Sequence, residues 1–511
     1  MVAVSGERHL RPDPDGRLRG SPSKLANVLV TATSESARST AGQHLLQLLV
    51  NLLARQFGVV RTVLLDIEDC PVQPGVFLSP LVAEGTLISA LLALGDAVGD
   101  GEITTHVADA MVPTSVVCVG CDIDPRNFGA PGIAITGQGW RAYARTDGAI
   151  GLIEGESANP FGPQLAACVA AGFCFKAAYD KQRKVHEVID LWTGDSDAPD
   201  LTGIELPSAY VLGLGAVGAA FGYSIAAARG LRGHLVAVDP QDMSETDRNR
   251  LLSGIWTSVG TPKHALFKAM FSDTAIAVSG FKGRWPQDYL GEPARDIPAD
   301  LRADEQQGRF QWVISCVDRN RDRATIAAQL PRHILAGSTF GMAAQTAYYA
   351  MVGPCECLAC RHRSLRQLNV EELAEQLKTM TAKERNSWFS DHGATQPVRA
   401  AIEEYLVDPT CAGPGAADLA KLGLEGEVDW AVGFVSAAAG VILAARFVRA
   451  AIVGVDAEIA RGSESRLLFW ADELRVSRAE RVIDCPLCQR PSPAWTQLWS
   501  EREGSDRCPR T

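Results

Sequence analysis

The sequence lacks the excess of basic residues that nucleic-acid binding requires. Its 511 residues contain 49 lysines and arginines against 60 aspartates and glutamates, which gives a formal net charge of −11. Proteins that bind phosphate backbones or anionic membrane surfaces need a basic face. We therefore expect neither nucleic acid nor a membrane as a partner. The contents of hydrophobic (46%) and charged (21%) residues are ordinary for a globular protein, and the length predicts roughly two to four domains.

Long hydrophobic runs are also missing. The longest one, from Trp430 to Ala445, is rich in Ala and Gly and too short to cross a bilayer, so we interpret it as a buried helix. Residues 1–24 are polar and contain no apolar core of the kind found in signal peptides. Thirteen cysteines, an odd number, then favour a reducing compartment where cysteines bind metals, react or pack. We expect a cytoplasmic protein.

One stretch in the middle of the chain has the pattern of a nucleotide-binding unit. The apolar run Tyr210–Leu212 is followed by Gly213, Gly215 and Gly218, spaced G-x-G-x-x-G, then by an Ala-rich helical pattern and a second apolar run that ends at Asp239. Such glycines let backbone N–H groups approach a phosphate at a helix N-terminus, and the acidic residue binds ribose hydroxyls. The pattern predicts a nucleotide site without distinguishing ATP from NAD. A turn that serves packing alone is the alternative.

Four downstream polar residues favour ATP. Asn249, Arg250, Lys263 and Asp318 follow the glycine turn, and Asp318 comes directly after an apolar run. Each alone is typical of a solvated surface or a helix N-cap. Together they suit a site where Arg250 and Lys263 neutralise a triphosphate, Asn249 holds its oxygens and Asp318 holds magnesium. A hydride-transfer enzyme needs no such set.

Two C-x-x-C pairs predict a zinc site. Cys357 and Cys360 form one pair, and Cys485 and Cys488 form the other. Each pair supplies two corners of a tetrahedron, and two pairs leave no position open for water, as in structural zinc sites. The metal would join the C-terminal tail to the sheet. Two redox dithiols or unpaired cysteines are the alternative, and the nearby Cys355 could replace one ligand.

The first part of the chain has a similar layout without the glycines. Strand patterns at 27–31 and 59–65 flank a helical pattern at 42–55, and Asp66 ends the second strand. The turn between residues 32 and 42 is bulky and contains an acidic residue, so its amides cannot approach a pyrophosphate. We predict a second, degenerate Rossmann-like half. An unrelated α/β domain is the alternative.

Several of these motifs in this order resemble the ThiF/MoeB and ubiquitin-activating enzyme superfamily over roughly residues 205–490. They are Gly213-Leu-Gly-Ala-Val-Gly218, Asp239, Asp247-Arg-Asn-Arg-Leu251, Lys263, Cys316-Val-Asp318 and the paired C-x-x-C. The resemblance implies that the C-terminal carboxylate of a ubiquitin-fold protein attacks the α-phosphate of ATP, and that a thiol or sulfur donor captures the acyl-adenylate. Leu251 departs from the family, which usually has Gln there.

The resemblance also implies a catalytic thiol. Cys411 lies in a Pro-rich loop between the two zinc pairs, the interval that holds the acceptor cysteine of ubiquitin-activating enzymes. Activating it requires a nearby cation or helix N-terminus, which the sequence does not reveal, and a packed or incidental cysteine is the alternative. A degenerate half before a competent one is similar to ubiquitin-activating enzymes, including the ubiquitin-activating-type proteins of bacterial antiviral operons.

We therefore expect an α/β protein with two Rossmann-like halves, a helical insert that contains a capping box at Thr381–Glu384, and a four-cysteine zinc site. The expected parts are a flexible arm (1–24), a degenerate adenylation-like domain (25–200), an active adenylation domain (205–360 and 412–490), a helical insert with the catalytic cysteine (361–411) and a tail (491–511).

The expected function is ATP-dependent activation of a ubiquitin-like protein that ends in Gly, followed by transfer to a separate conjugating enzyme. The protein would be a monomeric pseudo-dimer or a homodimer. One alternative is an adenylyltransferase for sulfur-carrier or peptide modification without a thioester. The other is a non-catalytic nucleotide-binding scaffold.

Overall fold

The computed structural model describes most of the chain. The described residues are 22, 25–81, 85–99, 101–106, 112–153, 157–192, 198–291, 297–306, 308–350, 355–361, 370–391, 394–407, 432–482, 485, 488 and 500. They divide into two compact units, one with two β-sheets and one with the three helices between residues 370 and 407. The domain boundaries drawn from the sequence stay predictions.

The first sheet has seven strands in the order β3-β2-β1-β4-β5-β6-β7. The strands are β1 (Ala26–Ala32), β2 (Val60–Asp66), β3 (Glu102–Thr104), β4 (Ser115–Val119), β5 (Gly132–Gln138), β6 (Arg141–Arg145) and β7 (His186–Asp190). The first five strands in this order, β3, β2, β1, β4 and β5, are parallel to one another. Strand β6 pairs antiparallel with β5, and β7 pairs antiparallel with β6. The helices of this half are α1 (Ser34–Arg38), α2 (Thr40–Ala54), α3 (Leu87–Val98) and α4 (Phe161–Ala178), with a short 3₁₀ turn, η2, at Pro125–Phe128.

The second sheet repeats this arrangement and adds one strand, in the order β10-β9-β8-β11-β12-β13-β14-β15. Its strands are β8 (Ala209–Leu212), β9 (Arg232–Val238), β10 (Ala275–Phe281), β11 (Trp312–Ser315), β12 (His333–Phe340), β13 (Ala343–Ala350), β14 (Glu464–Leu468) and β15 (Glu473–Ser477). The first five of this order are again parallel and the rest antiparallel. Both sheets thus begin with a central strand and extend in the same sequence of pairings, which is the 3-2-1-4 order of doubly wound folds.

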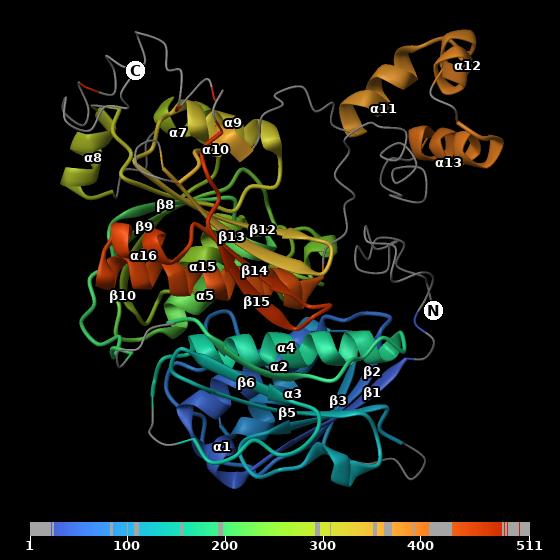
Figure 1. Ribbon diagram of the computed structural model, residues 1–511, viewed down its shortest axis with the longest axis vertical. Coiled ribbons are helices and arrows are strands. Elements are labelled where there is room, and N and C mark those ends of the chain that lie inside the picture. Colours follow the sequence, from blue (N-terminus) through green and yellow to red (C-terminus); the bar gives the residue numbers. More distant parts are fainter. Residues whose placement is uncertain are drawn as a thin grey trace. The chain divides into compact units, whose positions relative to one another are not determined.

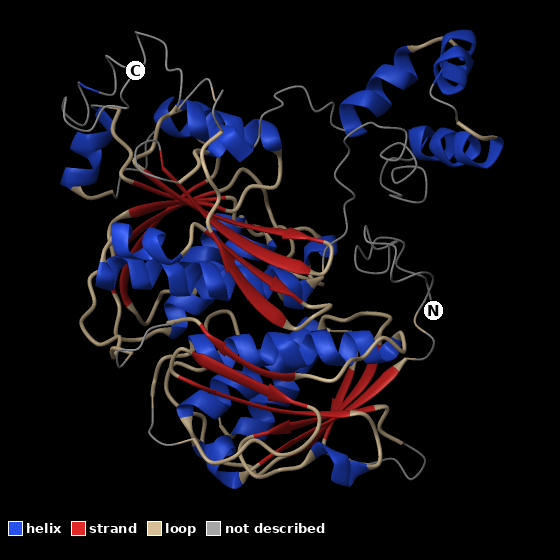
Figure 2. Cartoon of the chain, in the orientation of Figure 1, coloured by secondary structure: helices blue, strands red, loops and turns tan. Residues whose placement is uncertain are grey.

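Helices cover both faces of the second sheet (Figures 1 and 2). They are α5 (Ala216–Ala227), α6 (Lys263–Ala269), α7 (Gln287–Gly291), α8 (Ala299–Gln306), α9 (Asn320–Ala328), α10 (Leu358–Arg361), α15 (Gly433–Val453) and α16 (Val455–Arg461), with 3₁₀ turns η3 (Glu245–Asp247) and η4 (Trp256–Ser258). The strands predicted at 27–31, 59–65 and 210–212 are confirmed as β1, β2 and β8, and the buried helix predicted from Trp430 is confirmed as α15, which begins at Gly433.

Helices α4 and α15 occupy equivalent places in the two halves. Each follows the first antiparallel strand of its sheet, and the two pack against each other and against α2 and α5 (Figure 1). The run from Trp430 to Ala445 was expected to be too short to cross a bilayer, but this is wrong for the helix itself, because α15 continues past Arg446 to Val453. Both helices are long and apolar enough to cross a membrane, and 100% of the apolar window of α4 and 89% of that of α15 are buried. Each helix is covered by the sheet and a helix of its own half on one side and by the long helix of the other half on another, so α4 and α15 form part of the contact between the halves.

Buried ion pairs reinforce that contact. Lys176 on α4 is fully buried, and its Nζ lies 2.6 Å and 2.8 Å from the two carboxylate oxygens of Asp472, in the turn before β15. It also donates to the carbonyl oxygen of Phe469 at 2.6 Å. From the other side, Arg449 on α15 pairs with Glu458 and donates to the carbonyl oxygen of Leu191 in the first half.

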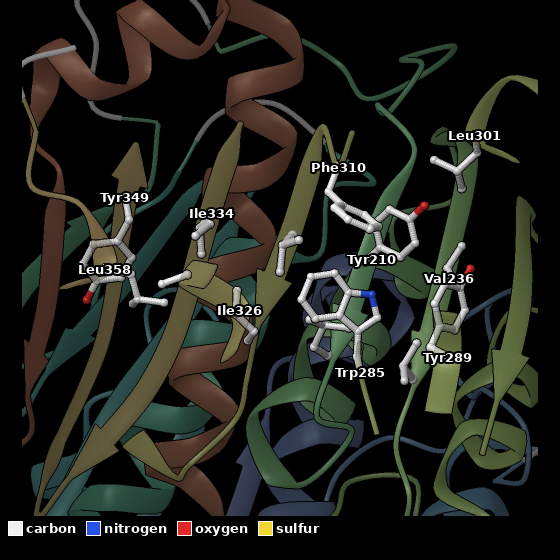
Figure 3. Close-up of a cluster of buried hydrophobic side chains, with 14 of the residues drawn as sticks. Tyr210, Val236, Trp285, Tyr289, Leu301, Phe310, Ile326, Ile334, Tyr349 and Leu358 are labelled. Atoms are coloured by element: carbon white, nitrogen blue, oxygen red, sulfur yellow. The ribbon is translucent and has the colours of Figure 1, made fainter. Parts of the chain in front are cut away.

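An aromatic cluster supports β8, the strand that leads into the glycine turn (Figure 3). Tyr210 packs edge-on against Tyr289 and Phe310, with ring centroids 5.9 Å and 5.5 Å away. The hydroxyls of Tyr210 and Tyr289 both donate to one carboxylate oxygen of Glu305, each at 2.6 Å. The segment between β10 and β11 is thereby attached to the base of the turn.

The three remaining helices, α11 (Val370–Thr379), α12 (Ala382–Asp391) and α13 (Gln396–Val407), share a small core of their own. The capping box predicted at the start of α12 is confirmed. The backbone N–H of Thr381 donates to the Glu384 carboxylate at 2.8 Å, and the N–H of Glu384 donates to the Thr381 hydroxyl at 3.3 Å.

Candidate nucleotide site and metal centre

The glycine turn joins β8 to α5 and lies against the end of β11. Gly213 has φ of +83°, and a Cβ there would come within 3.0 Å of the backbone of Cys316. A Cβ on Gly218 would lie 2.1 Å from the carbonyl oxygen of Gly213. Both positions therefore require glycine to close the turn. Gly215 differs, because a Cβ there would meet nothing within 4 Å, and it is the N-cap of α5. The space beside Gly215, at the start of α5, is therefore open.

Asp239 follows β9 and binds the glycine turn directly. One carboxylate oxygen accepts from the backbone N–H of Leu214 at 2.6 Å, and the other accepts from the N–H of Gln241 at 2.8 Å. The residue is 5% exposed, and burial raises the pKa of its carboxyl above the ordinary value. Each oxygen keeps a further lone pair for another donor, such as a ribose hydroxyl.

The two cations predicted to bind phosphate lie on one buried carboxylate. Arg250 Nη2 is 2.7 Å from one oxygen of Asp247, and Lys263 Nζ is 3.3 Å from the other. Ser244 donates to Asp247 from its N–H at 3.0 Å and its hydroxyl at 2.9 Å. Burial alone would raise the pKa of Asp247, but Arg250 and Lys263 hold it below its usual range. The group therefore stays ionised and fixes both cations.

Asn249 and Asp318 complete the predicted set. The Asn249 amide oxygen accepts from Arg250 Nη1 at 3.1 Å. Asp318 is exposed, beyond the end of β11, and the backbone of Cys316 and Val317 just before it touches the glycine turn. The N-cap of the following helix is Arg319, so Asp318 is not the cap of that helix. The structure thus brings Asp239, Asn249, Arg250, Lys263 and Asp318 to the edge of the second sheet where its parallel strands end.

Cys316 lies at the base of this site but has little nucleophilic character. Burial raises the pKa of its thiol well above the ordinary value, and only the thiolate reacts. Cys411, the predicted acceptor, falls outside the described residues, and its role stays a prediction.

The four predicted zinc ligands converge. The sulfur atoms of Cys357, Cys360, Cys485 and Cys488 all lie within 4.8 Å of one another, and three of the separations are 3.4, 3.6 and 3.7 Å. Thiolates at about 2.3 Å from a tetrahedral zinc ion are roughly 3.8 Å apart, so the cluster fits a four-coordinate metal. Cys355 is outside this group; its carbonyl oxygen accepts from Arg481 Nε at 3.0 Å.

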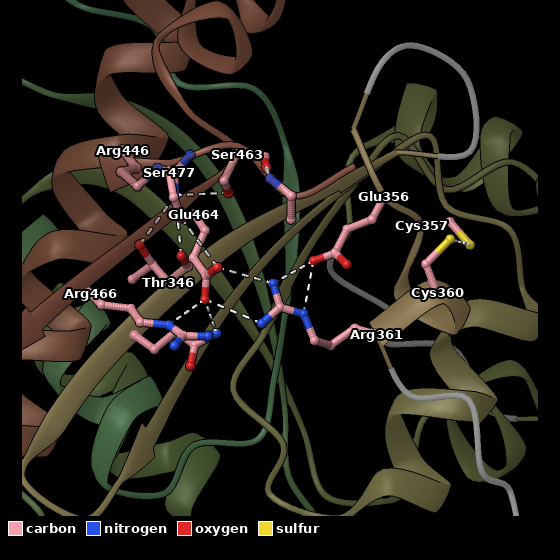
Figure 4. A network of polar contacts seen from close by, with 12 residues as sticks. Thr346, Glu356, Cys357, Cys360, Arg361, Arg446, Ser463, Glu464, Arg466 and Ser477 are labelled. Atoms are coloured by element: carbon pink, nitrogen blue, oxygen red, sulfur yellow. Dashed lines mark hydrogen bonds and ion pairs between the residues drawn. The ribbon is translucent and has the colours of Figure 1, made fainter. Parts of the chain in front are cut away.

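A polar network connects the metal centre to the second sheet (Figure 4). Arg361, next to Cys360, pairs with Glu356 at 2.6 Å and with Glu464 on β14 at 3.2 Å. Glu464 also accepts from Gln345 on β13 at 2.5 Å and from Arg466 at 2.6 Å. A metal bound by the cysteines would therefore anchor the C-terminal segment to β13 and β14.

Two features of the site were not predicted. Asp247 is the first residue of the Asp247–Leu251 motif, and no role was predicted for it. An Asp three residues before an Arg is nevertheless a recognisable spacing for a local ion pair. The second feature is a buried polar face on α2, whose signal is a polar residue at every fourth position, at Gln43, Gln47, Asn51 and Arg55.

Comparison with known proteins finds one family model, which matches part of the first half, and similar proteins that cover more than half of the chain. Residues 27–188 match the model of the BilD N-terminal domain. A relative in Sinorhizobium fredii, the uncharacterized protein y4jF, is 24% identical over 322 residues, which is 60% of this chain and 54% of that protein. The chain thus spans about half the length of this curated relative.

Solved structures similar to this chain include three crystal structures of E. coli MccB. They contain MccA-N7isoASN, AMPCPP with selenomethionine MccA, and ATP. Their sequence identities are 13%, 12% and 14%, and their TM-scores are 0.33, 0.29 and 0.29. Each match covers 55% of this chain and 66–67% of the MccB chain.

Proposed function

We propose that this protein uses ATP to adenylate the C-terminal carboxylate of a ubiquitin-like protein. The observation that carries the proposal is the gathering of Asp239, Asn249, Arg250, Lys263 and the exposed Asp318 around the glycine turn. The match of residues 27–188 to the BilD N-terminal domain supports the resemblance to ubiquitin-activating-type proteins of antiviral operons.

The residues of the site have distinct roles in this reaction. The backbone amides at the start of α5 receive phosphate oxygens in the open space beside Gly215, and Asp239 receives the ribose. A carboxylate oxygen of the partner attacks the α-phosphorus, a new P–O bond forms, and pyrophosphate leaves with the electrons of the broken bond. Arg250 and Lys263 neutralise the charge that gathers on the phosphates during this step. Magnesium held by Asp318 would add to that neutralisation.

Asp247 keeps the two cations in place before ATP arrives. Its two oxygens separate Arg250 from Lys263, and both cations are at most 7% exposed. The cations therefore need little reorganisation when a phosphate binds, which is the property expected of an electrostatically preorganised site.

Cys411 is proposed to receive the activated protein. Its thiolate would attack the acyl carbon of the adenylate, forming a thioester and releasing AMP, and a conjugating enzyme would then take the protein by thiol exchange. This step rests on the place of Cys411 in the sequence. The four-cysteine metal, proposed to be zinc, has a structural role.

Exchange of labelled pyrophosphate into ATP tests the adenylation step. We expect exchange that depends on a small protein ending in Gly, with candidates taken from neighbouring genes, and we expect Asp318→Ala to abolish it. Full exchange in Asp318→Ala would refute the magnesium assignment. ATP binding without exchange, with every candidate partner, would instead indicate a nucleotide-binding scaffold.

A thiol-sensitive adduct on gels tests the thioester. Cys411→Ala should lose the adduct while keeping exchange, and a persistent adduct would place the thioester on another cysteine. Exchange without any adduct in the unmodified protein would indicate adenylation for sulfur transfer or peptide modification.

A further inference from the structure

Helix α2 of the first half carries a polar face that points into the second half. Gln47, Asn51 and Arg55 are four residues apart, so they lie on one side of the helix, and each is at most 1% exposed. The Tyr223 hydroxyl of α5 donates to Gln47, and Asn51 Nδ2 donates to the carbonyl oxygen of Leu252 at 3.3 Å. This face therefore contacts both the helix that follows the glycine turn and the loop after η3.

Arg55 makes most of the contacts with that loop. Its Nη2 donates to the carbonyl oxygens of Leu252 at 2.9 Å and Gly254 at 2.8 Å, and its Nη1 donates to that of Arg248. Asn51 orients the guanidinium by accepting from Nε at 2.6 Å. Burial lowers the pKa of Arg55 to about 9, so the group remains charged at neutral pH. One buried cation thus binds three carbonyls of a single loop, and its partners in these bonds are neutral.

The loop reaches back into the first half through Arg248. The Arg248 guanidinium stacks over the rings of Trp256 and Phe57, and its Nη2 donates to the carbonyl oxygen of Val98 at the end of α3. Arg55 therefore extends from the first half to the loop, and Arg248 extends from the loop to the first half, so both arginines connect the two halves.

The held loop carries the groups proposed to bind phosphate. Asn249 and Arg250 lie between the first and second carbonyls bound by Arg55, those of Arg248 and Leu252. A carbonyl fixed on each side restricts the backbone dihedrals of the residues between them. The position of the Arg250 guanidinium therefore depends on a residue about 200 positions earlier, in the half whose own turn lacks the glycines.

We propose that Arg55 is a positioning residue for the nucleotide site. It does not touch ATP; it holds residues 248–254 so that Asn249 and Arg250 are preorganised for the phosphates. The first half, which has no glycine turn of its own, thereby contributes to ATP affinity. This inference rests on the proposed function for its ATP readout but not for its structural readout.

Lysine is the informative replacement. An ammonium keeps the charge, but it lacks the planar fork that reaches three carbonyls in different directions. A matched control is Arg449→Lys, because Arg449 is also a buried arginine that donates to a carbonyl of the other half, Leu191, away from the loop. A general weakening of the contact between halves would affect both variants.

Hydrogen exchange and ATP binding separate the two roles. In Arg55→Lys we expect amides 247–254 to exchange about tenfold faster and the KM for ATP in pyrophosphate exchange to rise about tenfold, a loss of about 1.4 kcal/mol, with a smaller change in kcat. Arg449→Lys should lower the melting temperature but leave unchanged both the hydrogen exchange of amides 247–254 and the KM for ATP. If Arg55→Lys folds poorly, Asn51→Ala provides a milder test of the same two quantities, because it keeps the Arg55 guanidinium and removes its Nε acceptor together with one 3.3 Å hydrogen bond to the Leu252 carbonyl.

Two outcomes would overturn the proposal. One is an Arg55→Lys protein whose melting temperature falls like that of Arg449→Lys while loop exchange and KM stay the same. The other is faster exchange over the whole first half rather than in the loop. If the unmodified protein shows no pyrophosphate exchange, the proposed function fails. Faster hydrogen exchange confined to residues 247–254 in Arg55→Lys would still establish that Arg55 positions the loop.

Discussion

Replacing Lys176 by methionine tests the buried ion pair that joins α4 to the turn before β15. Met fills a similar volume but leaves the Asp472 carboxylate, 2% exposed, without its ammonium partner. Removing one member of a buried pair typically costs about 3–5 kcal/mol. We expect a loss of that size in the free energy of unfolding from urea denaturation at pH 7.5. Adding Asp472→Asn to the Lys176→Met variant should recover at least half of the lost free energy of unfolding. Asn suits position 472 because the backbone φ there is +54°.

The pH dependence gives a sharper check on the same pair. Burial raises the pKa of Asp472 above its ordinary value, so the folded protein keeps this proton to a higher pH than the unfolded chain does. Stability from this group is therefore lost as pH rises from about 3.9 towards the raised pKa. Without Lys176 the pKa rises further, so the difference from the unmodified protein should shrink between pH 7.5 and pH 5. A loss below about 1 kcal/mol, or an equal loss at both pH values, would refute the description of this pair.

Two further predictions concern the glycine turn and the metal centre. Gly215→Ala should keep the melting temperature and raise the KM for ATP, because its Cβ enters the open space before α5. Gly218→Ala should lower the melting temperature, because its Cβ would lie 2.1 Å from the carbonyl oxygen of Gly213. Equal effects of the two changes on the melting temperature and KM would contradict this distinction. Metal analysis should find one zinc ion per chain. Cys485→Ser should lose the zinc together with thermal stability, whereas Cys355→Ser should keep it, because the Cys355 sulfur is outside the four-cysteine group. Loss of zinc in the Cys355 variant would show that the ligand set is wrong.

Local patterns predicted the elements well. The apolar run before Gly213 is β8, the run ending at Asp239 is β9, and the capping box at Thr381 starts α12. Each is governed by nearby residues: glycines permit a positive φ, and alternating or continuous apolar residues select strands or buried helices. The pairing of the four cysteines was also accessible, because their chemistry allows few alternatives.

Contacts between distant residues were not accessible in the same way. The four-residue spacing of Gln47, Asn51 and Arg55 is visible in the sequence, but their partners lie about 200 residues later. Nothing local specifies that Arg55 binds loop carbonyls rather than a carboxylate. The role of Asp247 was missed for a related reason: an acidic residue beside a phosphate site appears unfavourable until both of its cationic neighbours are located.

The contact of α4 with α15 has a consequence for concentration. Because both helices belong to one chain, the halves meet at an effective concentration fixed by the connecting segment and do not separate on dilution. An assembly of two separate subunits would dissociate as the protein becomes scarce. The contacts by which the first half holds residues 248–254 are therefore present in each molecule individually, even where only a few copies are present in a cell.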